Sequence, residues 1–177
     1  RNVLVAASDM RLAPPAGFTE QALGDGAGAL LVGNKNVIAE VLGSYSISDE
    51  LAATWRLDSD QYIRAWEDRF VMDESYSKVM PEAISGLMKK CNLSAKDFAK
   101  AVFDPPSDIR RHGQVAAGLG FEANQLLDPA SIFLNAGLLG SAMSFMMLVS
   151  ALEQAEPGQK ILFASYGNGA DAFVLQI

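Results

Sequence analysis

The chain has 177 residues; half of them are hydrophobic, one fifth are charged, and the formal net charge is −7 at pH 7. That composition is typical of an ordered globular protein and excludes a disordered or fibrous one. The excess of acidic side chains, with no basic cluster to offset it, argues against nucleic acid as a partner. Helix N-termini and a few cations still suffice to bind a small phosphorylated ligand.

The single cysteine, Cys91, excludes an internal disulfide framework and is typical of a reducing compartment, so we expect the cytoplasm. The longest apolar run, residues 136–152, is interrupted by Gly140 and several serines. It is too short and too rich in small residues for a membrane span, so it predicts a buried helix and no membrane partner. Because the sequence opens on Arg1 and enters a strand pattern at once, we also expect further residues upstream.

The first third of the chain predicts strands separated by glycine and proline. Residues 2–7 form a continuous apolar run, as in a strand covered on both faces. Residues 24–33 are a glycine-rich turn that leads into another buried strand, and residues 37–42 predict a third. Residues 49–66 are rich in polar residues and include two tryptophans, and their local structure stays open.

The middle of the chain alternates helices and one strand. Apolar positions recur at helical spacing over residues 75–91, with lysines in the last turn, which predicts a helix. Ser94 is a candidate N-cap of a short helix, and residues 101–103 predict a strand. A further helix is predicted over residues 110–119, ended by Gly120.

The end of the chain repeats the pattern of its beginning. Residues 141–155 predict a helix rich in Met and Leu, residues 160–165 a buried strand, and residues 166–175 a second glycine-rich turn with its strand. Such a repeat suggests two related halves. We assign residues 1–41 to the last two strands of the first half and residues 42–177 to a complete second half, so roughly 100 residues of the first half are expected upstream.

The two glycine-rich turns, residues 24–33 and 166–173, resemble those of the thiolase fold, in which each of two βαβαβαββ units has such a turn between its last two strands. Four further stretches resemble the hydroxymethylglutaryl-CoA synthase branch: residues 78–103, 119–121, 135–141 and 157–173. Together they cover nearly the whole chain. The resemblance implies an α/β, thiolase-like fold of duplicated units in a layered α/β/α arrangement, with the first unit incomplete.

The resemblance also implies a function. It predicts an acyl-CoA condensing enzyme or acyltransferase that performs Claisen-type chemistry on thioesters through a cysteine acyl-enzyme. The nucleophilic cysteine and the catalytic glutamate of this branch are expected before Arg1, so this chain alone is expected to be inactive. Acyl-CoA is then a substrate, no cofactor or metal ion is expected, and the partners are a second copy in a homodimer or other subunits of an acyltransferase complex.

The family's catalytic residues are only partly matched. The family histidine follows the strand that is residues 101–103 here, and Asp104 stands in its place, with Pro105 as an alternative equivalent. An aspartate has no imidazole N–H to donate, and as an anion it repels a developing enolate. Asn135 matches the family's asparagine, in the turn before the helix at Ser141. Asp104 motivates a second hypothesis, a catalytically degenerate subunit with a structural or regulatory role.

The glycine-rich turns differ in what they predict. Gly167, Asn168 and Gly169 are candidate substrate-binding residues, because their family counterpart borders the acyl pocket. Residues 24–28 do not have the spacing of a dinucleotide loop and precede a strand. They are either a structural tight turn or a place where backbone passes close to the reaction centre.

A few other residues are open to two interpretations. His112, the single histidine, is either a solvated surface residue or a relocated proton carrier. Arg110 and Arg111 either contact a coenzyme A phosphate or form a charged face. Cys91 lies at a helix end that disfavours a thiolate, so it is expected to be structural. A final group is expected in the core, with the wall of an acyl tunnel as the alternative: Met143, Met146 and Met147.

Overall fold

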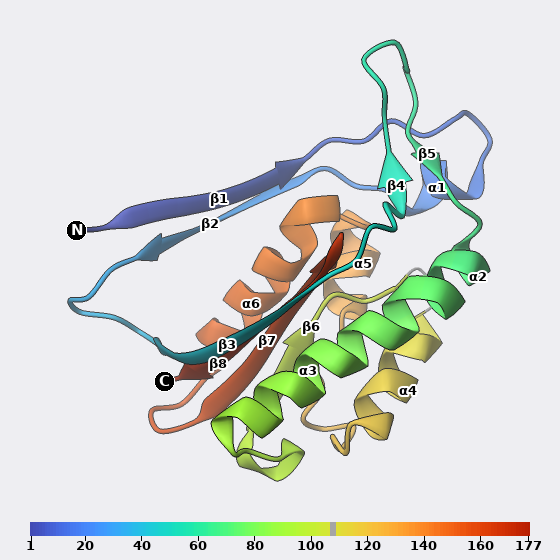
Figure 1. Cartoon of the computed structure of the whole chain (residues 1–177). Coiled ribbons are helices and arrows are strands. Elements are labelled where there is room, and N and C mark those ends of the chain that lie inside the picture. Colours follow the sequence, from blue (N-terminus) through green and yellow to red (C-terminus); the bar gives the residue numbers. More distant parts are fainter. Residues whose placement is uncertain (107–108) are drawn as a thin grey trace.

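A computed structural model of the chain describes residues 1–106 and 109–177 and contains two main sheets (Figure 1). The smaller sheet pairs β1 (Val3–Asp9) and β2 (Gly26–Val32) in an antiparallel hairpin. The larger sheet has the order β3-β8-β7-β6. Its strands are β3 (Glu40–Ser48), β6 (Lys100–Phe103), β7 (Lys160–Gly167) and β8 (Gly169–Gln176).

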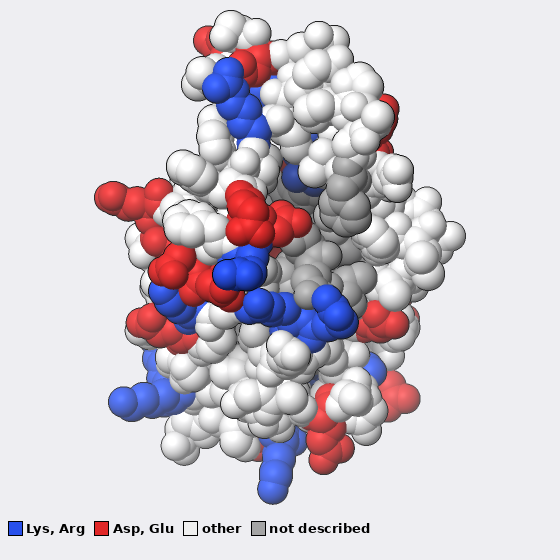
Figure 2. Space-filling model, turned by 90° about the vertical axis from the view of Figure 1, so that its right-hand side faces the viewer, with Lys and Arg blue, Asp and Glu red and all other residues white. Residues whose placement is uncertain are grey.

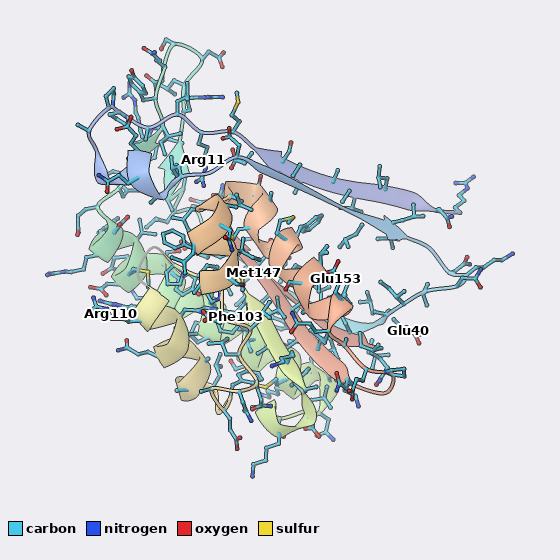
Figure 3. The ribbon with its side chains drawn as sticks, turned by 180° about the vertical axis from the view of Figure 1, so that it is seen from behind. Arg11, Glu40, Phe103, Arg110, Met147 and Glu153 are labelled. Atoms are coloured by element: carbon cyan, nitrogen blue, oxygen red, sulfur yellow. The ribbon has the colours of Figure 1, made fainter. Side chains whose placement is uncertain are left out.

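Helices cover both faces of the larger sheet. On one face lie α3 (Ser77–Cys91) and α4 (Ile109–Gly118). On the other face lies α6 (Met143–Glu153), which contacts β6 and β7 on one side and β2 on the other. Figure 3 shows Met147 on this central helix, between the hairpin and the larger sheet. The chain is therefore layered, with α6 as the layer between two sheets.

The remaining elements are short. They are α1 (Phe18–Ala22), β4 (Thr54–Trp55), β5 (Arg64–Ala65), α2 (Asp68–Val71), the π-helical turn η1 (Met72–Tyr76), the 3-10 turn η2 (Ala95–Asp97), α5 (Ala130–Ala136) and the 3-10 turn η3 (Gly140–Ala142). Among the described residues, no helix is both long and apolar enough to cross a membrane.

The helix predicted over residues 75–91 is present but starts earlier. The Glu67 carboxylate accepts hydrogen bonds from the backbone N–H groups of Arg69 and Phe70 and so caps α2, which continues through η1 into α3. The helix ends where Asn92 adopts a left-handed conformation, with φ of 55°. The π-helical turn changes the phase of the helix just before α3, which the simple 3.6-residue spacing does not anticipate.

The sequence misplaces the glycines of residues 24–33. Gly26 and Gly28 lie inside β2 and not in a turn before it. An added Cβ on Gly28 would come 3.0 Å from the Cβ of Phe145, and one on Gly24 would come 1.6 Å from the carbonyl oxygen of Ala136. These glycines therefore allow the β2 backbone to pack directly against the helices, in agreement with the structural interpretation.

The other predicted strands are present with shifted ends, but the prediction that β1 and β2 are buried is wrong. Most of their described residues are exposed, because α6 packs against only one side of this strand pair. The third strand was expected over residues 37–42, but β3 starts at Glu40 and runs to Ser48 with an irregularity between Val41 and Gly43. The short helix after Ser94 starts at the predicted N-cap, where the Asp97 carboxylate accepts from the Ser94 N–H at 2.7 Å. The helix α5 was not predicted.

An antiparallel strand pair lies near each end of the chain. Leu30 of β2 pairs with Val5 of β1, and Val174 of β8 pairs with Leu162 of β7, each in the second strand of an antiparallel pair. This pairing is what a duplicated unit requires, and the division into residues 1–41 and 42–177 remains a prediction. The hairpin of β1 and β2 extends away from the larger sheet and carries exposed apolar side chains: Val3, Leu4, Val5, Leu31 and Val32.

Candidate active site

A cavity of about 560 Å³ opens at the carboxyl ends of β6 and β7. Its walls include the segment after β1, α1, the β4 and β5 strands, the α2–η1 helix, the residues after β6, the segment that leads into α6, and the end of β7 with the turn after it. β6 and β7 are parallel, so side chains that follow them meet at one edge of the sheet. The fold therefore brings residues of both halves of the sequence to one hollow.

Asp104 lies in the wall of this cavity, directly after β6. Its Oδ2 accepts hydrogen bonds from the Ser165 hydroxyl at 3.0 Å and from the Tyr166 backbone N–H at 2.8 Å. Both of these bonds end on Oδ2. Burial raises the pKa of Asp104 from 3.8 to about 6, although the two hydrogen bonds act in the opposite direction.

Two tyrosines fix the backbone around Asp104. The Tyr76 hydroxyl, from η1, donates to the Asp104 carbonyl oxygen at 2.6 Å. The Tyr166 hydroxyl donates to Ser75 at 2.8 Å, and the Ser75 hydroxyl in turn donates to the Asp49 carboxylate. The two rings meet edge to face with centroids 5.2 Å apart. Burial raises the pKa of Tyr76, and the nearby Asp104 raises it further, so this phenol stays protonated.

The hydrogen-bond network continues from Asp104 into the central helix. Ser165 lies 3.2 Å, oxygen to oxygen, from the hydroxyl of Ser144, which is buried in the first turn of α6. Both serines line the cavity. The Asp104 carboxyl is thus held by a chain of hydroxyl groups that joins β6, β7 and α6.

Asp9 and Arg11, at the end of β1, form a second set of polar contacts in the cavity wall. Arg11 contacts the Asp9 carboxylate through Nε at 3.4 Å and donates from Nη2 to the Leu138 carbonyl oxygen at 2.9 Å (Figure 3). Asp9 also accepts from the backbone N–H of Ser141 at 3.1 Å. These contacts join the hairpin to the turn before α6, so Asp9 and Arg11 are accounted for as structural ties in the cavity wall.

The predicted site residues are only partly brought together. Gly167 and Asn168 line the cavity with Asp104. Gly169 does not line it; its φ is +117° and an added Cβ would come 1.9 Å from the Ile47 carbonyl oxygen, so it shapes the turn. Pro105, the alternative equivalent of the histidine, also lines the cavity.

Asn135 does not lie where it was expected. It is the penultimate residue of α5, not part of a turn, because residues 130–136 form a helix that ends at Gly137. Its side chain is exposed, donates to the Ser131 carbonyl oxygen at 2.7 Å and is not part of the cavity wall. The structure therefore separates the two candidate catalytic residues.

The expectation of a solvated His112 is wrong. The side chain is only 1% exposed, its Nε2 lies 3.0 Å from the Phe103 carbonyl oxygen, and its ring meets Phe103 edge to face. Burial lowers the pKa of His112 to about 4, so the imidazole is neutral at pH 7. The imidazole packs against β6 and is not among the residues that line the cavity. We therefore interpret His112 as a structural residue.

The contacts of Arg111, Cys91 and the methionines of α6 bear on the alternatives that the sequence left open for them. Arg111 forms an ion pair with Asp73 at 2.7 Å. Cys91 packs on Gly43 of β3, in agreement with a structural role. Met143 and Met147 are buried in the core between α6 and the sheet, and Met146 packs against its edge. Met143 also lines the cavity, and its place in the wall of an acyl tunnel remains a prediction.

Several residues of the site were missed from the sequence. Ser165 and Tyr166 follow the buried run of β7, and the parallel pairing with β6 puts them beside Asp104. That rule of parallel strands could have found them. Ser75, Tyr76 and Ser144 lie on helices whose rotation the sequence does not define, so no signal pointed to them.

Comparison with known proteins finds similar sequences. No family model matches the chain. It is 35% identical over 96% of its length to a hydroxymethylglutaryl-CoA synthase of Methanopyrus kandleri, of which it covers 48%. The hydroxymethylglutaryl-CoA synthase of Methanothermobacter thermautotrophicus is 32% identical over 98% of the chain, which covers 50% of it. The chain spans about half the length of these relatives.

Solved structures show the same fold. A crystal structure of hydroxymethylglutaryl-CoA synthase complexed with CoA matches 98% of the chain with a TM-score of 0.80 and 23% identity; the match covers 48% of that protein. The 3-oxoacyl-[acyl-carrier-protein] synthase III of Aquifex aeolicus matches 99% of the chain with a TM-score of 0.76 and 17% identity, over 58% of its length. The chain is thus similar to hydroxymethylglutaryl-CoA synthases over about half of their length and has a thiolase-like fold.

Proposed function

We propose that the intact protein, which contains this chain, is an acyl-CoA condensing enzyme or acyltransferase, and that the acyl end of a CoA thioester binds in the cavity beside Asp104. One observation carries the proposal: Asp104, at the position of the family histidine, lines a cavity of about 560 Å³ together with its hydrogen-bond partners Ser165 and Tyr166. A cavity of that size is in the range of small-molecule sites. The similarity to hydroxymethylglutaryl-CoA synthases supports the choice of thioester.

The acyl group is carried, in this proposal, by a cysteine outside residues 1–177. Cys91 is unsuited to that role because its sulfur packs on β3 and it ends α3, where the carbonyl end of the helix dipole disfavours a thiolate. The nucleophile and its acyl-enzyme therefore remain part of the proposal for the whole protein.

Asp104 serves as the general base. At pH 7 a carboxyl with a pKa of about 6 is mostly ionised, and it can take a proton from the carbon next to the thioester carbonyl. The C–H bond breaks, the proton goes to Oδ1, and the electron pair moves to the carbonyl as an enolate. Asp104 is neutral after this step, so it no longer repels the enolate and can donate a hydrogen bond to it. This answers the objection that an aspartate only repels the anion.

A second function has one observation in its favour. Oδ2 of Asp104 is held by Ser165 and Tyr166, and such bonds also suit a purely structural tie between β6 and β7. In that case the chain belongs to a catalytically degenerate, thiolase-like subunit with a structural or regulatory role in an acyltransferase complex. The two functions differ in whether the intact protein transfers an acyl group.

The test is acyl transfer by the intact protein. Incubation with acetyl-CoA and other short acyl-CoAs should give an increase in protein mass equal to one acyl group and a matching release of coenzyme A. Asp104→Asn should lower kcat for condensation by about 100-fold or more, the typical contribution of a general base. Asp171→Asn, which changes an exposed carboxylate on β8, should leave it unchanged. No acyl transfer with any acyl-CoA would favour the degenerate subunit.

The assembly is a separate part of the proposal. A homodimer, with or without other subunits, and a cytoplasmic location rest on the resemblance and on the single cysteine. The molar mass of the purified intact protein in solution, measured by light scattering, tests the dimer, and a monomer would contradict it.

A further inference from the structure

Three aromatic side chains form an exposed cluster beside the cavity. Trp55 comes from β4, Trp66 follows β5, and Phe70 lies on α2. The ring centroids of Trp55 and Trp66 are 5.4 Å apart, and those of Trp66 and Phe70 are 5.7 Å apart. Trp66 is nevertheless 51% exposed and Phe70 44% exposed. Large rings that pack on one another yet face solvent are typical of a surface that binds something.

The cluster lines a shallow hollow next to the cavity. The hollow has a volume of about 480 Å³, and its wall is completed by Glu50, Leu51 and Ala52. Trp55 and Trp66 line this hollow and also the cavity that contains Asp104. A ligand in the cavity can therefore contact Asp104 and the two tryptophans at once.

The chemistry of the hollow suits a purine ring. Flat aromatic faces stack on nucleic-acid bases, and such stacking tolerates any base because each has a π face. Glu50 adds a carboxylate, which accepts hydrogen bonds from an amino group such as that of adenine.

A cation for phosphate groups lies between the two hollows. Arg56 follows Trp55, lines the cavity and is exposed, and within the described residues it makes no ion pair. Figure 2 shows basic side chains gathered across the middle of the face that carries α2 and β5 at the right of Figure 1, in a chain whose net charge is −7. Guanidinium groups are well suited to phosphate oxygens.

We propose that Trp55, Trp66 and Phe70 form a stacking platform for the adenine ring of a CoA thioester, with Arg56 toward its phosphates and Asp104 at its acyl end. The assignment rests on the proposed function, because it takes the ligand of the cavity to be a CoA thioester. It adds which residues recognise the nucleotide half of that ligand, and it predicts that this half and the acyl half are recognised separately.

The experiment measures the affinity of the intact protein for three probes by calorimetry: coenzyme A, adenosine 3′,5′-bisphosphate and pantetheine. Trp66→Ala should weaken the binding of coenzyme A and of the bisphosphate by about fivefold or more, the lower end for loss of one stacking ring. The binding of pantetheine, which lacks the nucleotide, should not change. Trp66→Phe keeps a ring and should stay within about twofold of the wild type. Leu134→Ala, at a side chain 80% exposed on α5, is the surface control.

The outcomes separate the two proposals. Coenzyme A binding that Trp66→Ala leaves unchanged overturns the platform and leaves the proposed function standing; this is also the result if another protein chain covers the cluster. Equal weakening of coenzyme A and pantetheine also overturns the platform, because the substitution has then disturbed the acyl end. A wild-type protein that binds none of the three probes contradicts the proposed function and the platform together.

Discussion

Asp104 combines two properties at one position: its carboxyl is buried enough to hold a proton near neutral pH, and the residue lines a cavity. Its hydrogen bonds from Ser165 and Tyr166 favour the charged form, while burial favours the neutral form, and burial has the larger effect. A group with a pKa near 6 can accept and return a proton at pH 7 with little cost in either direction.

The first prediction concerns the pH dependence of activity. If ionised Asp104 is the base, kcat/KM of the intact protein rises with pH through about 6 and then levels off. Ser165→Ala removes a hydrogen bond that stabilises the carboxylate, so the pKa rises and the rise in activity moves to higher pH. If Ser165→Ala does not shift the pH profile, the group whose titration controls the activity is not Asp104.

The second prediction concerns stability and pairs Asp104 with His112. The raised pKa of Asp104, about 6 against 3.8, means that the folded state binds more protons between these values, so its contribution to stability falls as pH rises from 4 to 6. The lowered pKa of His112, about 4 against 6.5, means that the unfolded state binds more protons there, so its contribution rises over the same range. The two effects oppose each other.

Removing one group should therefore reveal the other. Relative to the wild type, Asp104→Asn should make the free energy of unfolding rise with pH between 4.5 and 6, and His112→Gln should make it fall, each by about 1 kcal/mol per pH unit. Urea unfolding at several pH values provides the measurement. Parallel pH profiles for all three proteins would show that these groups do not have the shifted pKa values.

Among the elements, the β7–β8 turn is where glycine is required. Gly169 has a φ of +117°, and an added Cβ would come 1.9 Å from the Ile47 carbonyl oxygen on β3. Gly158 has a φ of +90° but open space around it. A side chain at Gly158 would cost only the strain of a positive φ. A side chain at Gly169 would cost that strain and also a steric clash with β3.

The third prediction follows from this difference. Gly169→Ala should lower the free energy of unfolding by about 3 kcal/mol or more, and Gly158→Ala by about 1 kcal/mol. Chemical unfolding followed by circular dichroism measures both. Equal losses would mean that the close approach of β8 to β3 at Gly169 is not part of the folded structure.

Local patterns predicted most elements because their signals are short-range. The apolar runs of β1, β6 and β7, the cap at Ser94 and the stop at Gly120 are all confirmed. The failures have long-range causes. The glycines of β2 are required by contact with α5 and α6, and the π-helical turn rotates the start of α3, neither of which a single segment reveals.

On the scale of the whole molecule, the resemblance pointed to residues that line one cavity but not to the groups that hold them. Asp104, Gly167 and Asn168 line that cavity, and their role in a reaction remains a prediction. The tyrosines and serines that hold Asp104 come from positions far apart in the sequence, so only the assembled layers bring them together. His112 is likewise buried because α4 packs against the sheet at β6. In the sequence, its charged neighbours Arg110 and Arg111 suggested an exposed position instead.

A structure of the intact protein with a bound, non-reactive acyl-CoA analogue tests the central claim most directly. The account predicts the acyl carbonyl in the cavity, with the carbon next to it within reach of Oδ1 of Asp104 and the Ser165 hydrogen bond to Oδ2 preserved. An analogue bound with its acyl end outside this cavity, or with Asp104 turned away from it, would contradict the account.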